Sequence, residues 1–288
     1  MQITFRQVSP TYQPGSPFQS TALSNIDFTV ESGEFLALIG HTGSGKSTLA
    51  QHINGLLKPT SGQVLMDGSD IHADGYSKKT LRQKVGMVFQ YAEHQLFEET
   101  VEKDIAFGPK NLGLNETEIK ERVQEALEKV GLPYEEFKEK SPFELSGGQM
   151  RRVAMAGVLA MRPEVLVLDE PAAGLDPMSR EDMLSLIQSL HQGGTTIVMI
   201  SHSMDDVARF ATRAVVMQKG TVAMEGTPEE IFLHADALEN MGLDVPVICK
   251  LNNELKKAGL SLPDGLYDEE EMLSALLNLW KGGNEHAE

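Results

Sequence analysis

A glycine-rich run of eight residues, placed between an apolar stretch and a predicted helix, constrains this chain more than any other feature. The run, GHTGSGKS at positions 40–47, follows the apolar residues 35–39. It matches the phosphate-binding loop pattern, in which glycines let the backbone curl so that N–H groups face phosphate oxygens. The following helix adds its positive N-terminus. A simple glycine-rich turn is the alternative. The candidate phosphate ligands are Gly40, His41, Thr42, Gly43, Ser44, Gly45, Lys46, Ser47 and Thr48.

Two acids that follow a second apolar run favour the phosphate loop over the simple turn. Residues 165–168 predict a buried strand, and Asp169 and Glu170 come next, at the strand end where ligands of open parallel sheets bind. Lys46 would pair with the β- and γ-phosphates, and Ser47 and Asp169 would hold Mg²⁺. Glu170 is then the candidate that polarises an attacking water. Both acids could otherwise be ordinary charges at the end of a strand.

A second candidate anion site lies about a hundred residues after the first. Ser146, Gly147, Gly148 and Gln149 form a turn that opens a predicted helix, and such a turn presents N–H groups to an anion. One chain does not easily fold both sites onto the same phosphate. Two chains that face each other head to tail can do so, and the pair of motifs therefore predicts a site shared between chains.

The composition narrows the setting in which such a site would work. The chain has 288 residues, a net charge of −17 and a single cysteine, Cys249. The charge argues against a nucleic-acid partner and against direct adhesion to anionic lipid. One cysteine excludes an internal disulfide, so we expect a cytoplasmic protein with Cys249 as a small core residue. No apolar run approaches the roughly 20 residues of a membrane span, so membrane contact should pass through another protein.

The pairing of these motifs resembles the ATP-binding-cassette ATPases. The resemblance implies ATP hydrolysis by Glu170 with help from His202, which follows the predicted strand 196–200, and from Gln90, which closes the predicted strand 85–89 and also touches Mg²⁺. It further assigns Asp176 to a loop at the dimer interface and Tyr12 to stacking on adenine, a role for which Phe18 competes. Gln90 could instead be an ordinary loop residue, and the chain holds seven histidines besides His202.

The predicted fold follows from the order of elements together with this resemblance. We expect an α/β fold of the P-loop NTPase class, RecA-like, with a mostly parallel sheet and an antiparallel β portion. A nucleotide-binding domain should span residues 1–230 and contain a helical insert at about 91–160. Residues 231–288 should form a helical extension that contacts the other chain of the dimer. Its apolar positions would suit either a packing face or an exposed partner site.

The segment after Gln90, YAEHQLFEETV at positions 91–101, resembles one branch of the family, the ATPases of energy-coupling-factor transporters. In that branch an acidic groove receives arginines from a membrane scaffold, which implies a partner-binding role for Glu93, Glu98, Glu99 and Glu102. A solvated acidic face is the alternative. The runs MRR at 150–152 and FGPKN at 107–111 resemble the second of the two paired ATPases of this branch.

We therefore interpret the chain as an ATPase subunit that energises uptake of a vitamin or a transition-metal ion. The implied partners are a second ATPase chain, for which a paralogue is favoured over a copy, a membrane-embedded scaffold, and a substrate-binding membrane subunit. One competing interpretation is the ATPase of a conventional importer or exporter. A more distant one is a soluble cassette ATPase that acts on nucleic acid or ribosomes.

Overall fold

The computed structural model describes residues 1–12 and 20–284, and the chain divides into two compact units. The first unit consists of Met1–Glu34 and Ser47–Ile200, and the second of Phe35–Lys46 and Ser201–Glu288. In the sequence, the chain passes from the second unit to the first between Lys46 and Ser47, at the end of the phosphate loop. Helix α1 (Lys46–Ile53) begins at the same point.

Three parallel strands in the first unit carry the residues that the sequence placed at strand ends. They are β8 (Val85–Val88), β9 (Val165–Asp169) and β10 (Thr196–Ile200), and β9 pairs with both of the others. Every residue of the three strands is buried, as expected for strands covered on both faces. The register aligns Val88 with Leu168 and Asp169 with Ile200. Gln90 and Glu170 therefore follow neighbouring strands at the same edge.

A four-stranded sheet forms the antiparallel part of the first unit. Its order is β4 (Ile26–Val30), β1 (Ile3–Ser9), β6 (Ser61–Met66) and β7 (Ser69–Asp70), and each neighbouring pair is antiparallel. Phe5 and Phe28 stack with ring centroids 4.8 Å apart and help to hold β1 against β4. A short ribbon of β2 (Thr11–Tyr12) and β3 (Ser20–Thr21) extends from β1.

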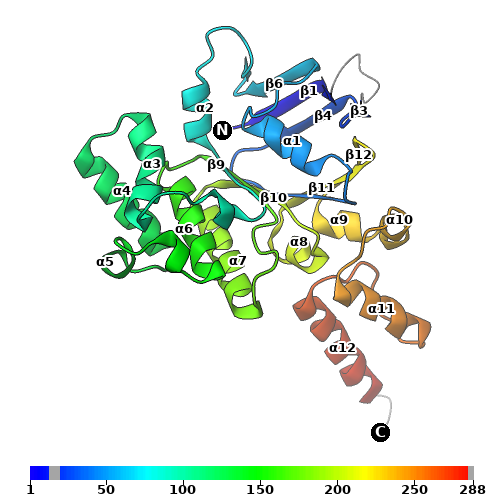
Figure 1. Cartoon of the computed structure of the whole chain (residues 1–288). Coiled ribbons are helices and arrows are strands. Elements are labelled where there is room, and N and C mark those ends of the chain that lie inside the picture. The colour runs from blue at the N-terminus through cyan, green and yellow to red at the C-terminus, as the bar shows by residue number, and fades with distance from the viewer. Residues whose placement is uncertain (13–19, 285–288) are drawn as a thin grey trace. The chain divides into compact units, whose positions relative to one another are not determined.

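Helices make up the rest of the first unit, and those between α3 and α6 are drawn in green in Figure 1. Helix α4 illustrates why they form where they do: Asn115 and Glu118 make a reciprocal capping box, and Val123, Ala126 and Leu127 bury one face. Residues 92–159 are therefore mainly helical. The helices are α2 (Lys78–Lys84), η1 (Ala92–Gln95), α3 (Val101–Leu112), α4 (Glu116–Lys129), α5 (Tyr134–Phe137), η2 (Pro142–Glu144), α6 (Gly147–Leu159) and α7 (Pro177–Gln192).

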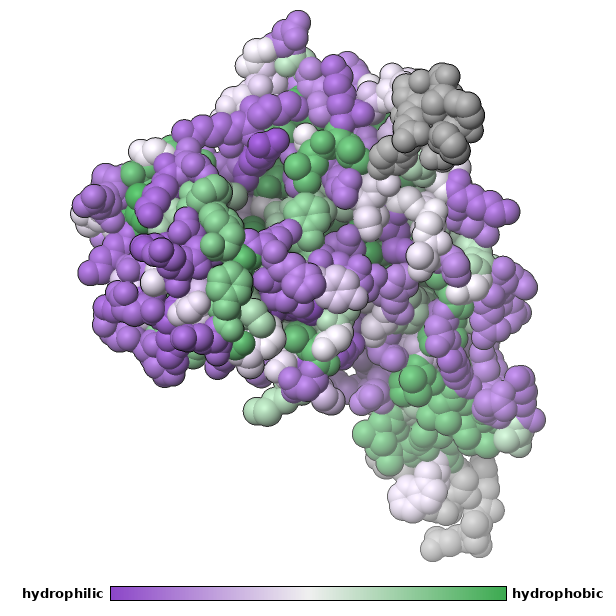
Figure 2. All heavy atoms as spheres, viewed as in Figure 1, coloured by the Kyte–Doolittle hydropathy of each residue, from purple (hydrophilic) through white to green (hydrophobic). Residues whose placement is uncertain are grey.

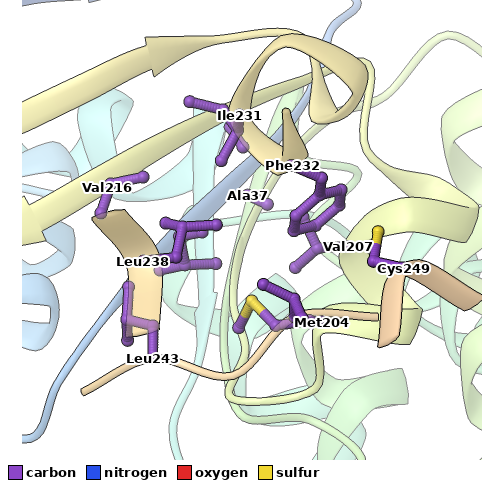
Figure 3. Packing of buried hydrophobic residues seen from close by; sticks show 12 residues of the cluster. Ala37, Met204, Val207, Val216, Ile231, Phe232, Leu238, Leu243 and Cys249 are labelled. Carbon is purple, nitrogen blue, oxygen red and sulfur yellow. The ribbon is translucent and has the colours of Figure 1, made fainter. Parts of the chain in front are cut away.

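The second unit packs helices around three strands. Strand β5 (Phe35–Gly40) pairs in parallel with β11 (Arg213–Gln218), which pairs antiparallel with β12 (Thr221–Gly226). Figure 3 shows the core, in which Ala37 of β5 and Val216 of β11 share one apolar cluster with Phe232. Cys249 is buried in the same cluster, as expected, and burial raises the pKa of its thiol to about 11. The helices are α8 (Met204–Phe210), α9 (Pro228–Phe232), α10 (Ala235–Asn240), α11 (Val247–Lys257) and α12 (Glu269–Asn284).

The last two helices have only a small core of their own. Met272 packs on Leu262 and Leu266, while another side of α12 leaves Leu273, Leu277 and Trp280 exposed. Figure 2 shows the resulting apolar patch over α11 and α12. None of the helices in the described part of the chain combines the length and apolar character that a membrane crossing requires.

Candidate active site

The phosphate loop of the second unit is shaped by glycines and closed by its own lysine. Gly40, Gly43 and Gly45 have φ values of 152°, 82° and 106°, conformations that side-chain-bearing residues rarely adopt. The Lys46 Nζ donates to the carbonyl oxygens of Gly40 (2.6 Å) and His41 (3.1 Å), so the loop curls around a buried ammonium. This arrangement is a cradle of backbone dipoles with one fixed positive charge.

The structure brings Gln90 and Glu170 together at the ends of two neighbouring strands of the first unit. Asp169 ends β9 and is buried, and Glu170 follows with a φ of 50°, which is uncommon for a residue other than glycine. The Glu170 N–H donates to the Ile200 carbonyl at 3.1 Å. The Gln90 Nε2 donates to the Glu170 carboxylate at 3.1 Å. Left-handed backbone at such a residue costs about 1–3 kcal/mol and concentrates at functional sites.

The candidate second anion site is the N-terminus of α6. Ser146 caps the helix in a reciprocal box: its hydroxyl accepts from the Gln149 N–H (3.3 Å), and the Gln149 side chain accepts from the Ser146 N–H (3.0 Å). Gly147 has open space where a Cβ would lie, whereas a Cβ on Gly148 would come within 3.2 Å of the Ser179 hydroxyl. The start of α6 therefore presents backbone rather than side chains.

Asp176 lies beside this helix start. It caps α7, accepting hydrogen bonds from the N–H groups of Met178 (3.1 Å) and Ser179 (3.0 Å). Hydrogen bonds from the Ser179 side chain and backbone hold the pKa of Asp176 below its usual value. Because a Cβ on Gly148 would meet the Ser179 hydroxyl, Asp176 and the Ser146–Gln149 turn lie near each other, at the N-terminal ends of α7 and α6.

Arg151 is a functional candidate that the sequence reasoning missed. The residue is 5% exposed, and its guanidinium binds both oxygens of Glu93, through Nε to Oε2 (3.0 Å) and Nη2 to Oε1 (2.9 Å). Its Nη1 donates to the carbonyls of Ala173 (2.5 Å) and Pro171 (3.3 Å). Spacing could have indicated it, because Arg151 lies four residues before the buried Met155, on the same face of α6.

Glu93 is therefore paired inside the chain. Burial would raise the pKa of Glu93, but hydrogen bonds and the charge of Arg151 hold it below the usual value for a glutamate. The other three predicted partner-binding acids differ from it. Glu98 is half-buried, Glu99 pairs with Lys103 at 2.6 Å on the surface, and Glu102 accepts from the Tyr134 hydroxyl at 2.5 Å.

A groove of about 560 Å³ opens in the first unit beside this segment. Its lining comes from α2, α3, α6 and the residues after η1 and is mainly apolar, with Phe97 and Phe107 meeting edge to face at 5.1 Å. Asp104 is the one acid among its described lining residues, and its carboxylate accepts from two backbone N–H groups. None of the four predicted glutamates lines this groove, so their partner-binding role stays a prediction.

Two further predicted roles also stay predictions. His202 lies two residues after β10 and is exposed. The backbone of Tyr12 belongs to β2, but its side chain and the whole of Phe18 lie outside the described residues. The structure therefore gives no test of which aromatic residue stacks on adenine.

Comparison with known proteins agrees with this geometry. Residues 23–173 match the ABC transporter family model. The chain is 51% identical over 285 residues to the energy-coupling factor transporter ATP-binding protein EcfA2 of Clostridium perfringens, covering 99% of this chain and 100% of that protein. It is 54% identical over 279 residues to the EcfA2 of Latilactobacillus sakei, covering 96% of each chain.

Solved structures show the same fold. CbiO1 of Clostridium perfringens, described as part of the ABC transporter complex CbiONQ, matches with a TM-score of 0.73 and 37% identity, covering 89% of this chain and 96% of that one. The cassette MJ0796, solved as a dimer with ADP and Pi, matches with a TM-score of 0.70 and 31% identity, covering 78% and 98%. The predicted fold class is confirmed. The chain belongs to the ABC transporter family and, within it, to the ATP-binding proteins of energy-coupling factor transporters.

Proposed function

We propose that this chain hydrolyses ATP to energise uptake of a micronutrient, a vitamin or a transition-metal ion, through an energy-coupling factor transporter. The observation that carries the chemistry is the hydrogen bond between Gln90 and Glu170 at the ends of β8 and β9. Glu170 directly follows the buried Asp169. A carboxylate held there by a left-handed backbone and a neighbouring amide is placed to accept a proton from an attacking water. Glu170 is therefore the proposed base, and His202 keeps the supporting role that the resemblance to cassette ATPases implies.

The donor set suits magnesium bound with ATP. Ser47, Gln90 and Asp169 offer a hydroxyl, an amide and a carboxylate, all oxygen ligands. Among the described residues no three His, Cys, Asp or Glu side chains cluster as a metal cage. The single carboxylate among the three proposed ligands fits Mg²⁺, which usually takes one or two carboxylates and completes its shell with water and substrate phosphates. When bound, magnesium neutralises phosphate charge, while Lys46 and the loop N–H groups orient the γ-phosphate.

Two chains would share each ATP. The Ser146–Gln149 turn begins helix α6, and the N-terminus of a helix favours an anion such as phosphate. This supports a role for the turn opposite the phosphate loop of a second ATPase chain. Asp176 lies at the same end and would meet that second chain. We favour a paralogue over a copy as the partner. The apolar side of α12 is the face that the C-terminal extension would use in the same dimer.

The groove beside η1 is the proposed seat of the membrane scaffold. Phe97 and Phe107 are 57% and 47% exposed, a large apolar surface for a soluble chain, and they suit the apolar side of a scaffold helix. Glu98, Glu99 and Glu102 border the same segment and would pair with the scaffold's arginines. This docking would hold the chain at the cytoplasmic face of the membrane, beside a substrate-binding membrane subunit.

Two variants of the assembled transporter separate the chemistry from the docking. Lys46→Ala should lose ATP binding while the subunit still co-purifies with the scaffold. Phe107→Ser should keep ATP binding by the isolated subunit but release the scaffold. The measurements are a pull-down, an ATP titration and uptake in proteoliposomes. A Phe107→Ser complex that assembles and transports normally would remove the groove from the proposal, and ATP-independent uptake would remove the function itself.

A further inference from the structure

Arg151 connects three parts of the first unit that the proposed mechanism treats separately. It belongs to α6, whose N-terminus is the Ser146 turn. The Nε and Nη2 atoms of its guanidinium bind the Glu93 carboxylate in η1. Its Nη1 binds the carbonyls of Pro171 and Ala173, in the turn after the proposed base. Four acceptors on two other segments thus converge on one buried side chain.

The geometry of guanidinium makes this a rigid connection. Its five N–H donors lie in one plane and cannot be deprotonated in a protein, so each partner is held in direction as well as in distance. Breaking one side of a buried pair leaves an uncompensated charge, which resists rearrangement of any single segment. The three segments should therefore move together or not at all.

The contacts fall three residues from each member of the catalytic pair. Glu93 follows Gln90 by three residues, and Ala173 follows Glu170 by three. Arg151 thus holds a second point on each chain segment whose first point is the Gln90–Glu170 hydrogen bond. A shift of α6 would move the guanidinium of Arg151, and its hydrogen bonds would then displace both segments.

We propose that Arg151 is a positioning residue that keeps the side chains of Gln90 and Glu170 aligned with each other and couples this alignment to the position of helix α6. The proposal rests on the function assigned above. Its consequence is that a displacement of the Ser146 turn, which serves the ATP of the opposite chain, changes the alignment of this chain's own base. Arg151 would therefore link the two ATP sites of the dimer.

The neighbouring arginine provides a matched control. Arg152 has the same side chain one position along α6, but it pairs with Asp182 of α7 at 2.6 Å and donates to the Val130 carbonyl. It is more exposed, with 23% of its side chain accessible against 6% for Arg151. Neither of its partners lies in the segments that follow Gln90 or Glu170.

The test compares Arg151→Gln with Arg152→Gln in the assembled transporter. Misplacing catalytic groups by about 1 Å can cost about 10²-fold in rate. We therefore expect kcat to fall by about that factor in Arg151→Gln, with the ATP dissociation constant within about threefold of the parent. Arg152→Gln should keep kcat near the parent value. Hydrogen exchange of residues 90–95 and 170–176 should speed up in the first variant and not in the second.

Two further variants guard against simple misfolding. Arg151→Lys retains the charge but not the planar fork, so it should recover thermal stability more fully than kcat. Glu93→Gln should lower kcat as Arg151→Gln does, and the double variant should be less impaired than the two losses multiplied. A parental kcat in folded Arg151→Gln, equal losses in both arginine variants, or kcat and stability recovering together in Arg151→Lys would overturn the proposal. Glu170→Gln with parental turnover would instead overturn the proposed base.

Discussion

The phosphate loop at residues 40–47 and the cluster around Arg151 hold their groups by different means. The loop uses backbone: three glycines with positive φ and two carbonyls that accept from Lys46. The cluster is organised by side chains: a buried guanidinium binds a glutamate carboxylate and two backbone carbonyls of the segment after Glu170. A backbone site is encoded in consecutive residues, whereas a side-chain cluster is assembled by the fold, here from an ion pair between residues 58 positions apart. The first constrains local geometry, and the second constrains relative motion.

The largest effect should come from removing the base that the cluster positions. Glu170→Gln keeps the shape of the side chain and its contact with Gln90 while losing the proton acceptor. Loss of general-base catalysis typically costs about 10²–10⁴-fold, or roughly 3–5 kcal/mol of barrier. ATP affinity should be preserved, because the phosphate loop is untouched. Single-turnover hydrolysis and an ATP titration on the same preparation make the measurement, and near-parental turnover would show that another group is the base.

The backbone site should fail through stability. A Cβ on Gly40 would lie 2.4 Å from the Met217 carbonyl and 2.6 Å from the Ser44 hydroxyl. Gly40→Ala should therefore lower the free energy of unfolding by about 3 kcal/mol, the upper end for overpacking a filled site. Gly43→Ala is the control, since its Cβ would meet open space and only the φ of 82° opposes it, at about 1–2 kcal/mol. Urea unfolding of both variants measures the difference, and equal losses would contradict the steric explanation.

The contrast also explains what the sequence could predict. The phosphate loop, the strand-end acids and α4 follow from consecutive residues, and the predicted strand 196–200 matches β10 in its bounds. Side-chain partners that lie far apart in the sequence of one chain have no such signal. The resemblance of segment 91–101 implies a partner-binding role for Glu93, and nothing in that segment indicates that its carboxylate pairs with Arg151, 58 positions away. The apolar groove beside this segment has no consecutive signal either, because its lining combines Phe107 of α3 with Met161, which follows α6.

A smaller effect should come from two histidines of the first unit, His52 and His72. His52 of α1 is fully buried, with Nδ1 2.7 Å from the Thr48 carbonyl, and burial lowers its pKa. Burial, followed by the charge of Lys78 at 3.0 Å, lowers the pKa of His72 despite Asp70. The folded chain therefore binds fewer protons than the unfolded chain as pH falls below about 6.5, the ordinary histidine value. Stability is complete above that pH and is lost toward the lower folded pKa.

Urea unfolding at pH 7.5, 6.5 and 5.5 measures this dependence. Each histidine can contribute a slope of at most about 1.4 kcal/mol per pH unit. His52→Leu should flatten the curve in this range, because it removes a buried group that is forced to accept a proton on unfolding. A slope that survives His52→Leu and His72→Leu together would assign the pH dependence to other groups.

The smallest effect within the isolated chain should come from replacing Glu99, whose exposed ion pair contrasts with the buried ion pair of Arg151. Its pair with Lys103 is solvated and spans one helical turn, and its pKa is lowered by the hydrogen bond and charge of Lys103. Water and salt screen such pairs, so Glu99→Gln should leave the unfolding midpoint and turnover of the subunit unchanged. If Glu99 meets a scaffold arginine, the same variant should release the scaffold at lower salt than the parent. Phe107→Ser should release it regardless of salt, because the contact it removes is apolar. A salt titration of both pull-downs distinguishes the two contributions, and identical release curves for Glu99→Gln and the parent would show that this acid belongs to a solvated face.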